Sequence, residues 1–227
     1  PDVVALLVEH KAEVNTYDEN HVTPLHVAVS NGYEAIVELL LGHNADTNAR
    51  DGDEFTPLYV AASHGHEAIV ELLIKHNADI DACDGVEFTP LHVAATHGYD
   101  GVAELLIKHN ADIDACDEIQ RTPLHLAACV GNRSGAELLI KHNADIEARD
   151  HLQWTPLHQA AGERHMAVVE LLVKNNAVID ARDGSDCTPL NAARCNKHSD
   201  VVAFLTKNGA DPLGCPRAAD RLGAGRK

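Results

Sequence analysis

A four-residue run that begins with Thr-Pro recurs along this chain at one fixed spacing. The threonines stand at 23, 56, 89, 122, 155 and 188, each 33 residues after the one before. Thr is a favoured N-cap and Pro is favoured at the first helical position, so each pair predicts the start of a helix. A repeat of this length indicates stacked units, none of which can bury its apolar face without its neighbours.

The pattern inside one period predicts two helices and a projecting loop. A short first helix continues from Thr-Pro through paired alanines and ends at a Gly, as at Gly65. Apolar residues at helical spacing, such as Ile69, Val70 and Leu73, then predict a second helix with a wide buried stripe. Asn77 follows that helix at a position typical of a left-handed C′ cap. The extended, Asp-rich stretch before the next Thr-Pro predicts a hairpin-like finger.

Helix, turn, helix and finger in 33 residues, opened by Thr-Pro-Leu-His, resembles the ankyrin repeat over about residues 1–214. The resemblance implies an all-α fold of helix-turn-helix repeats with β-hairpin-like fingers, an ankyrin-repeat solenoid. The chain opens on the second half of a truncated repeat, so we expect a fragment of a longer protein, and we expect a disordered tail at its end. The predicted segments are 1–16 for the half repeat, then 17–49, 50–82, 83–115, 116–148, 149–181 and 182–214 for the repeats, and 215–227 for the tail.

The fingers lack the glycine that the ankyrin family usually carries two residues before the Thr. We therefore expect finger tips of altered shape, partly compensated by Gly52, Gly85 and Gly184 two positions earlier. The residues that stand in place of this glycine are His21, Glu54, Glu87, Gln120, Gln153 and Asp186.

Histidine and cysteine are abundant, but their phase argues for structural roles. Nine of the 16 histidines recur in two slots, after Thr-Pro-Leu and just before the second-helix cap. By resemblance to the family, the first kind bonds the finger backbone and ties neighbouring repeats together. Catalysis requires a nucleophile, a base and an orienting group that converge on one pocket, whereas these slots are spread along a ladder. We therefore expect no enzyme activity, no cofactor and no metal site.

The cysteines show no pairing pattern. Cys83 and Cys116 share one finger slot a period apart, where neighbouring repeats lie about 8–10 Å from each other, beyond the reach of a disulfide. Reduced thiols of this kind are typical of an intracellular protein, and we expect a cytoplasmic one.

Partner specificity should reside in residues that break the repeat pattern on the concave surface of fingers and first helices. The residue just before each Thr at the tip includes two Phe, one Arg and the only Trp of the chain, types that dominate interface energies. The alternative is that the rings pack finger against finger. The predicted partner-binding residues are Phe55, Tyr59, Phe88, His97, Ile119, Arg121, Leu152 and Trp154.

The formal net charge of −17 indicates which partners the chain can attract. Nucleic acid and anionic membranes would be repelled, so we expect a protein or peptide partner that is basic or of mixed charge and carries apolar anchors. We expect the chain itself to be a monomer.

Two alternatives to a simple binding scaffold remain. The segment could serve as the targeting arm of a larger enzyme or scaffold. It also resembles the targets of an asparaginyl hydroxylase that favours Leu eight residues before Asn, as Leu7 precedes Asn15 and Leu40 precedes Asn48. A turn-forming role explains the same asparagines.

Overall fold

In the computed structural model, residues 2–212 are described, and the chain divides into two compact units, Pro1–Glu118 and Ile119–Lys227. The division falls inside the predicted repeat 116–148. The predicted disordered tail, 215–227, lies outside the described residues. In the first unit the helices are α1 (Asp2–Glu9), α2 (Pro24–Ser30), α3 (Glu34–Gly42), α4 (Pro57–His64), α5 (Glu67–Lys75), α6 (Pro90–His97) and α7 (Asp100–Lys108). In the second unit they are α8 (Pro123–Val130), α9 (Arg133–Lys141), α10 (Pro156–Gly162), α11 (Met166–Lys174), α12 (Pro189–Cys195) and α13 (Ser199–Lys207).

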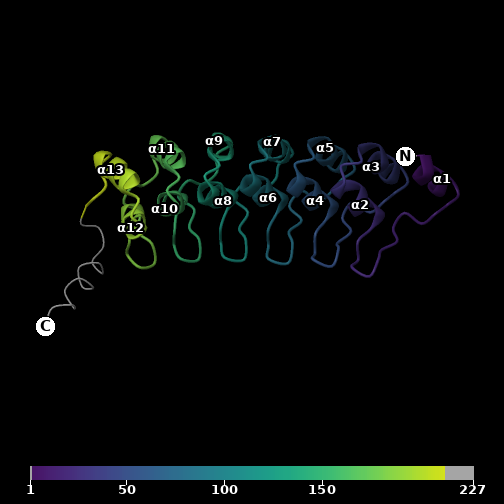
Figure 1. Ribbon diagram of the computed structural model, residues 1–227, viewed down its shortest axis with the longest axis horizontal. Coiled ribbons are helices and arrows are strands. Elements are labelled where there is room, and N and C mark those ends of the chain that lie inside the picture. The colour runs from purple at the N-terminus through teal and green to yellow at the C-terminus, as the bar shows by residue number, and fades with distance from the viewer. Residues whose placement is uncertain (1, 213–227) are drawn as a thin grey trace. The chain divides into compact units, whose positions relative to one another are not determined.

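Each unit is a stack of helix pairs in two layers. In the first unit the first helices α2, α4 and α6 pack side by side, and the second helices α3, α5 and α7 do the same (Figure 1). In the second unit α8, α10 and α12 form one layer and α9, α11 and α13 the other (Figure 1). The finger loops project from the first-helix layer, as the helix-turn-helix repeat predicts.

The first helices begin where the Thr-Pro pattern predicts. Thr89 is the N-cap of α6 and Pro90 follows at its first position. Thr89 and His92 form a reciprocal capping box, because the Thr hydroxyl receives the His92 backbone N–H while His92 Nδ1 receives that of Thr89. The sequence thus specifies the start of these helices locally.

The predicted helix ends are also confirmed. Gly65, Gly98 and Gly131 end α4, α6 and α8 in the left-handed conformation, with φ between 70° and 76°. Asn77 after α5 has φ 62°, the left-handed C′ conformation predicted for it. In the last two repeats Arg164 and Lys197 replace the glycine and still adopt φ 65° and 62°.

The core of each unit is built from leucine and alanine. Leu58 and Leu91 are fully buried in first helices, and the neighbouring Ala61 and Ala62 are buried as well, which lets the helices approach closely. Second helices add Ile69, among other apolar residues. No helix within residues 2–212 has the length and apolar character needed to cross a bilayer.

The fingers are turns rather than paired strands, and no strand occurs among residues 2–212. The expectation of altered finger tips is wrong. The six residues that replace the family's glycine all adopt the left-handed conformation themselves, with φ between 57° and 65°. Gly52 and Gly184 instead join fingers, since their backbone N–H groups donate to the carbonyls of Asn20 and Leu152.

Candidate functional site

Five of the fingers are shaped by an aspartate at the start of the finger. Asp51 Oδ1 accepts hydrogen bonds from the backbone N–H groups of Asp53 and Phe55, at 3.0 and 2.9 Å. The Asp51 N–H in turn donates to the Phe55 carbonyl. This closed turn fixes the residue that precedes Thr-Pro, which is the tip position where partner-binding residues were predicted. The same bonds recur in the fingers that begin at Asp18, Asp84, Asp150 and Asp183.

Histidines of the Thr-Pro-Leu-His run join each finger to the repeat before it. His26 Nε2 donates to the Phe55 carbonyl at 3.0 Å, and His158 Nε2 donates to the Cys187 carbonyl at 3.2 Å. Burial lowers the pKa of His158, which keeps the ring neutral and leaves Nδ1 free to accept the Thr155 N–H. These histidines therefore have the tying role that the family resemblance implied.

In the first unit, three predicted aromatic residues form a group: Phe55 and Phe88 lie at the tips of neighbouring fingers, and Tyr59 lies in the first turn of α4. Phe55 and Tyr59 stack almost in parallel, with ring centroids 4.4 Å apart and 6° between the planes. The Tyr59 hydroxyl donates to Asp84 Oδ2 at 3.0 Å, and burial together with this carboxylate raises the tyrosine pKa. Phe88 follows Asp84 on the next finger and stacks on His92, at 5.1 Å. Phe55, Tyr59 and Phe88 all remain partly exposed.

Trp154 in the second unit is held at two points. Its ring stacks on His158 with centroids 6.0 Å apart, and its Nε1–H donates to Asp183 Oδ2 at 2.9 Å. A Cβ built on Gly162 would lie 3.7 Å from the indole, so the ring reaches the last residue of α10. The indole is half-buried, so it packs on its own fold while part of its surface stays exposed.

The other predicted residues of the second unit lie on the same fingers. Ile119 and Leu152 are 37% and 52% exposed, and the His151 N–H donates to the Ile119 carbonyl, which joins their two fingers. Arg121, at the tip position of its finger, is half-buried. Exposed apolar side chains therefore lie on the Trp154 finger and on the finger before it.

His97 lies apart from the finger tips, at the last position of α6. Its Nδ1 donates to the Val93 carbonyl at 3.0 Å, and its exposed ring stacks on Tyr99. His64 makes the same helix-end bond to Val60 one repeat earlier. His97 thus lies at the C-terminal end of a first helix, whereas the aromatic group lies at the N-terminal ends of α4 and α6.

Two aspartates contribute a role that the sequence analysis missed. In both Asp84 and Asp183, one carboxylate oxygen accepts local backbone N–H groups. The second oxygen holds the aromatic residue of the preceding repeat, Tyr59 or Trp154. The aromatic residues precede these aspartates by 25 and 29 residues, so each pair joins one repeat to the finger of the next.

The candidate hydroxylation sites also bridge repeats. Asn15 Oδ1 accepts the Asp46 N–H and its Nδ2 donates to the Asn44 carbonyl, while Asn48 Oδ1 accepts the Asp79 N–H at 2.8 Å. Both residues are exposed. A modifying enzyme would therefore have to displace a bond between repeats.

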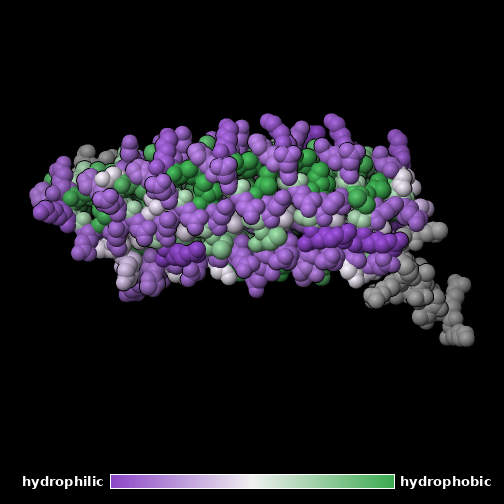
Figure 2. Space-filling model, turned by 180° about the vertical axis from the view of Figure 1, so that it is seen from behind, coloured by the Kyte–Doolittle hydropathy of each residue, from purple (hydrophilic) through white to green (hydrophobic). Residues whose placement is uncertain are grey.

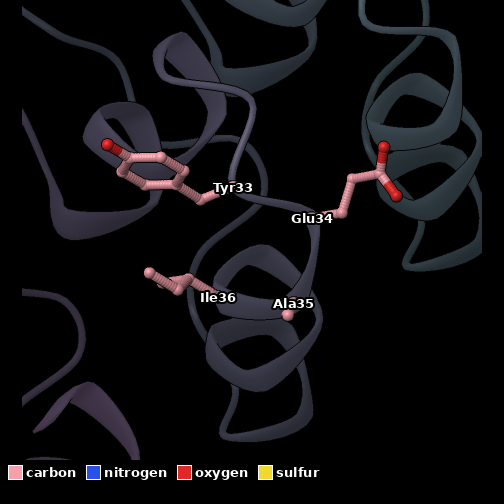
Figure 3. A pocket seen from close by; sticks show the side chains of 4 residues that line it. All are labelled: Tyr33, Glu34, Ala35 and Ile36. Carbon is pink, nitrogen blue, oxygen red and sulfur yellow. The ribbon is translucent and has the colours of Figure 1, made fainter. Parts of the chain in front are cut away.

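A shallow hollow of about 390 Å³ lies at the start of α3, away from the fingers. It is lined by Tyr33, Glu34, Ala35 and Ile36, and its lining is almost wholly apolar. Tyr33 and Ile36 point to one side of the helix while Glu34 points to the other (Figure 3). Because no polar groups converge there, the hollow offers nothing to orient a substrate.

Stacked helix pairs with turn-shaped fingers define a helical repeat protein of the kind that presents an extended surface. Family models described as ankyrin repeats match residues 1–51, 58–150 and 148–213, and another, for ankyrin repeats in many copies, matches residues 32–74. The chain therefore belongs to the ankyrin-repeat family, whose members are in general non-catalytic modules for protein–protein interaction. A search of curated proteins returns no match.

Proposed function

We propose that this chain is a non-catalytic scaffold that binds a protein or peptide on the surface formed by its fingers and first helices. The observation that carries the proposal is the set of partly exposed aromatic side chains at finger tips. Phe55, Phe88 and Trp154 occupy one repeated position, and each is placed by the Asp-centred turn before it. A rigid support lowers the entropic cost of binding, because the ring is ordered before the partner arrives.

Residue variation along the repeat supports the same surface. Slots that shape the fold carry the same residue types from repeat to repeat, whereas the tip slot carries Val22, Phe55, Phe88, Arg121, Trp154 and Cys187. Variation in a slot with fixed geometry allows a binding surface to differ along its length without disturbing the stack. We include Tyr59, His97, Ile119 and Leu152 in this surface.

The absence of catalysis is part of the proposal. The polar residues that could have suggested chemistry are engaged in structure: the Thr-Pro-Leu-His histidines bond Thr and the next finger, and the finger aspartates bond backbone N–H groups. The net charge of −17 favours a basic or mixed-charge partner over nucleic acid or an anionic membrane. We further propose a monomer, and an intracellular, cytoplasmic location on the basis of the free thiols of Cys83, Cys116, Cys129 and Cys195.

The test is capture of a partner from an extract of the native cell type, with identification by mass spectrometry. The double variant Phe88→Ala/Trp154→Ala should lose the captured protein while still unfolding cooperatively. The matched control is Tyr33→Ala/Val178→Ala, which removes two exposed apolar side chains away from the finger tips, both 53% exposed. Equal capture by both variants would refute the proposed surface, and collapse of the fold in the first variant would assign the two rings to packing.

A further inference from the structure

The finger tips of the first unit combine aromatic rings with carboxylates that have no counterpart in the next two fingers. Glu54 and Glu87 precede Phe55 and Phe88, and both are exposed. In the second unit the same position holds Gln120 and Gln153 in the first two fingers and Asp186 in the last. The two glutamates and the two glutamines share the left-handed conformation, with φ between 63° and 65°, so the backbone is the same and only the charge differs.

The acidic character extends beyond these two residues. Asp53 is an exposed carboxylate on the first of these fingers, and the equivalent residue of the Trp154 finger is Leu152. Hydrophilic residues predominate along the finger side of the face drawn in Figure 2. The Phe55 finger therefore presents a ring edged by Glu54 and Asp53. The Phe88 finger carries Glu87 beside the exposed apolar Val86, and the fingers of Ile119 and Leu152 present apolar side chains without a carboxylate at these positions.

One guanidinium of the chain already lies beside this surface. Arg50 Nη1 donates to the carbonyls of Glu54 and Cys83 and lies 3.5 Å from Glu54 Oε2. One repeat later the position equivalent to Arg50 is Cys83, so Glu87 has no arginine four residues before it. The finger of Glu87 and Phe88 thus carries the same glutamate and phenylalanine as the Phe55 finger, but not the arginine that Arg50 supplies there.

We propose that the fingers of Phe55 and Phe88 bind a basic segment of a partner protein, with arginine or lysine side chains over the rings and opposed to Glu54 and Glu87. This inference rests on the proposed scaffold function and names the chemistry of the partner for one of the two units. Cations are attracted to the faces of aromatic rings, and a ring edged by carboxylates adds direct charge complementarity. Arginine fits best, because its planar guanidinium both stacks on a ring and donates to a carboxylate.

The probe is a fluorescein-labelled nona-arginine peptide, with binding followed by fluorescence anisotropy at two salt concentrations. Glu54→Gln/Glu87→Gln places at these positions the residue that two fingers of the second unit carry there, so the fold should be preserved. The control is Glu34→Gln/Glu38→Gln, which removes the same charge from exposed residues of α3. We expect the finger variant to raise the Kd about fivefold and the α3 variant less than twofold. Exposed ion pairs are weak, and only carboxylates that lie next to the bound peptide form them.

A second variant isolates the rings. Phe55→Leu/Phe88→Leu keeps apolar side chains without aromatic faces and should raise the Kd for nona-arginine about two- to fivefold per ring, and that for nona-lysine by less. If the finger and α3 variants weaken binding equally, the peptide responds only to net charge and the inference is overturned. If the native partner is captured equally by the wild type and Glu54→Gln/Glu87→Gln, the inference fails while the scaffold function stands.

Discussion

Trp154→Phe should separate the contribution of the indole to stability from its contribution to partner binding. The wild-type side chain donates from Nε1 to Asp183 Oδ2 at 2.9 Å and stacks on His158. Phenylalanine keeps a ring over His158 but has no donor and covers less apolar surface. Asp183 Oδ1 still accepts the N–H groups of Ser185 and Cys187, and Oδ2 loses its protein donor.

The expected magnitude follows from these contacts. Loss of the Nε1–H bond costs about 1 kcal/mol, less than the roughly 1.5–3 kcal/mol typical of a charged acceptor, because the half-exposed carboxylate regains water. Loss of part of a half-buried ring costs about 0.5–1 kcal/mol. The sum, about 1.5–2 kcal/mol, corresponds to a fall in Tm of roughly 3–8 °C for a chain of this size.

Urea unfolding followed by far-ultraviolet circular dichroism measures this change, since the variant removes the only tryptophan and with it the fluorescence signal. A double-mutant cycle with Asp183→Asn should give a coupling energy of about 1 kcal/mol for the bond. A coupling energy of zero would show that the bond between Trp154 and Asp183 does not contribute to stability. A loss above about 4 kcal/mol would be the cost of disrupting a packed core and would remove Trp154 from the binding surface.

The remaining predictions concern the fold and one modification. Gln153→Gly should raise the free energy of unfolding by roughly 0.5 kcal/mol, because relief of a left-handed conformation outweighs the added entropy of the unfolded chain. A lower free energy of unfolding, measured by urea denaturation, would contradict this. Because burial lowers the pKa of His158 in the folded state, the unfolded chain binds the proton more readily, and stability should fall as pH drops from 7 through the ordinary value of about 6.5. His158→Asn should reduce that slope in urea unfolding measured at pH 7 and 5, and an unchanged slope would exclude His158 as its source. An asparaginyl hydroxylase should oxidise a peptide containing Asn48 faster than the folded chain, where Asn48 Oδ1 holds the Asp79 N–H; equal rates by mass spectrometry would show that this bond is no barrier.

Helix boundaries could be predicted because their signals are local. Thr89 and Pro90 specify the start of α6, and Asn77 specifies the turn after α5, all within a few residues of sequence. The finger shape is also set by local residues, but the expectation of an altered shape considered the wrong ones. A missing glycine was given more weight than the aspartate four residues before the tip, although Asp51 fixes the turn through two N–H bonds and Glu54 adopts the left-handed conformation.

The contacts of the candidate site could not be predicted in the same way. Tyr59 and Asp84 lie in different repeats, and the tyrosine ring that donates to Asp84 also stacks on Phe55. The repeat spacing indicates which slots face each other, but not which side chain in a slot finds a donor or acceptor. The same limit applies to Trp154 and Asp183.

The central claim is that a partner contacts the finger tips, and photo-crosslinking tests it most directly. A photoreactive benzoylphenylalanine would replace Phe55, Phe88 or Trp154 in turn, with replacement of Tyr33 as the control at an exposed aromatic position away from the fingers. After irradiation in an extract of the native cell type, the account predicts one crosslinked partner from the three finger positions and none from position 33. Crosslinking from position 33 with none from the finger tips would contradict it.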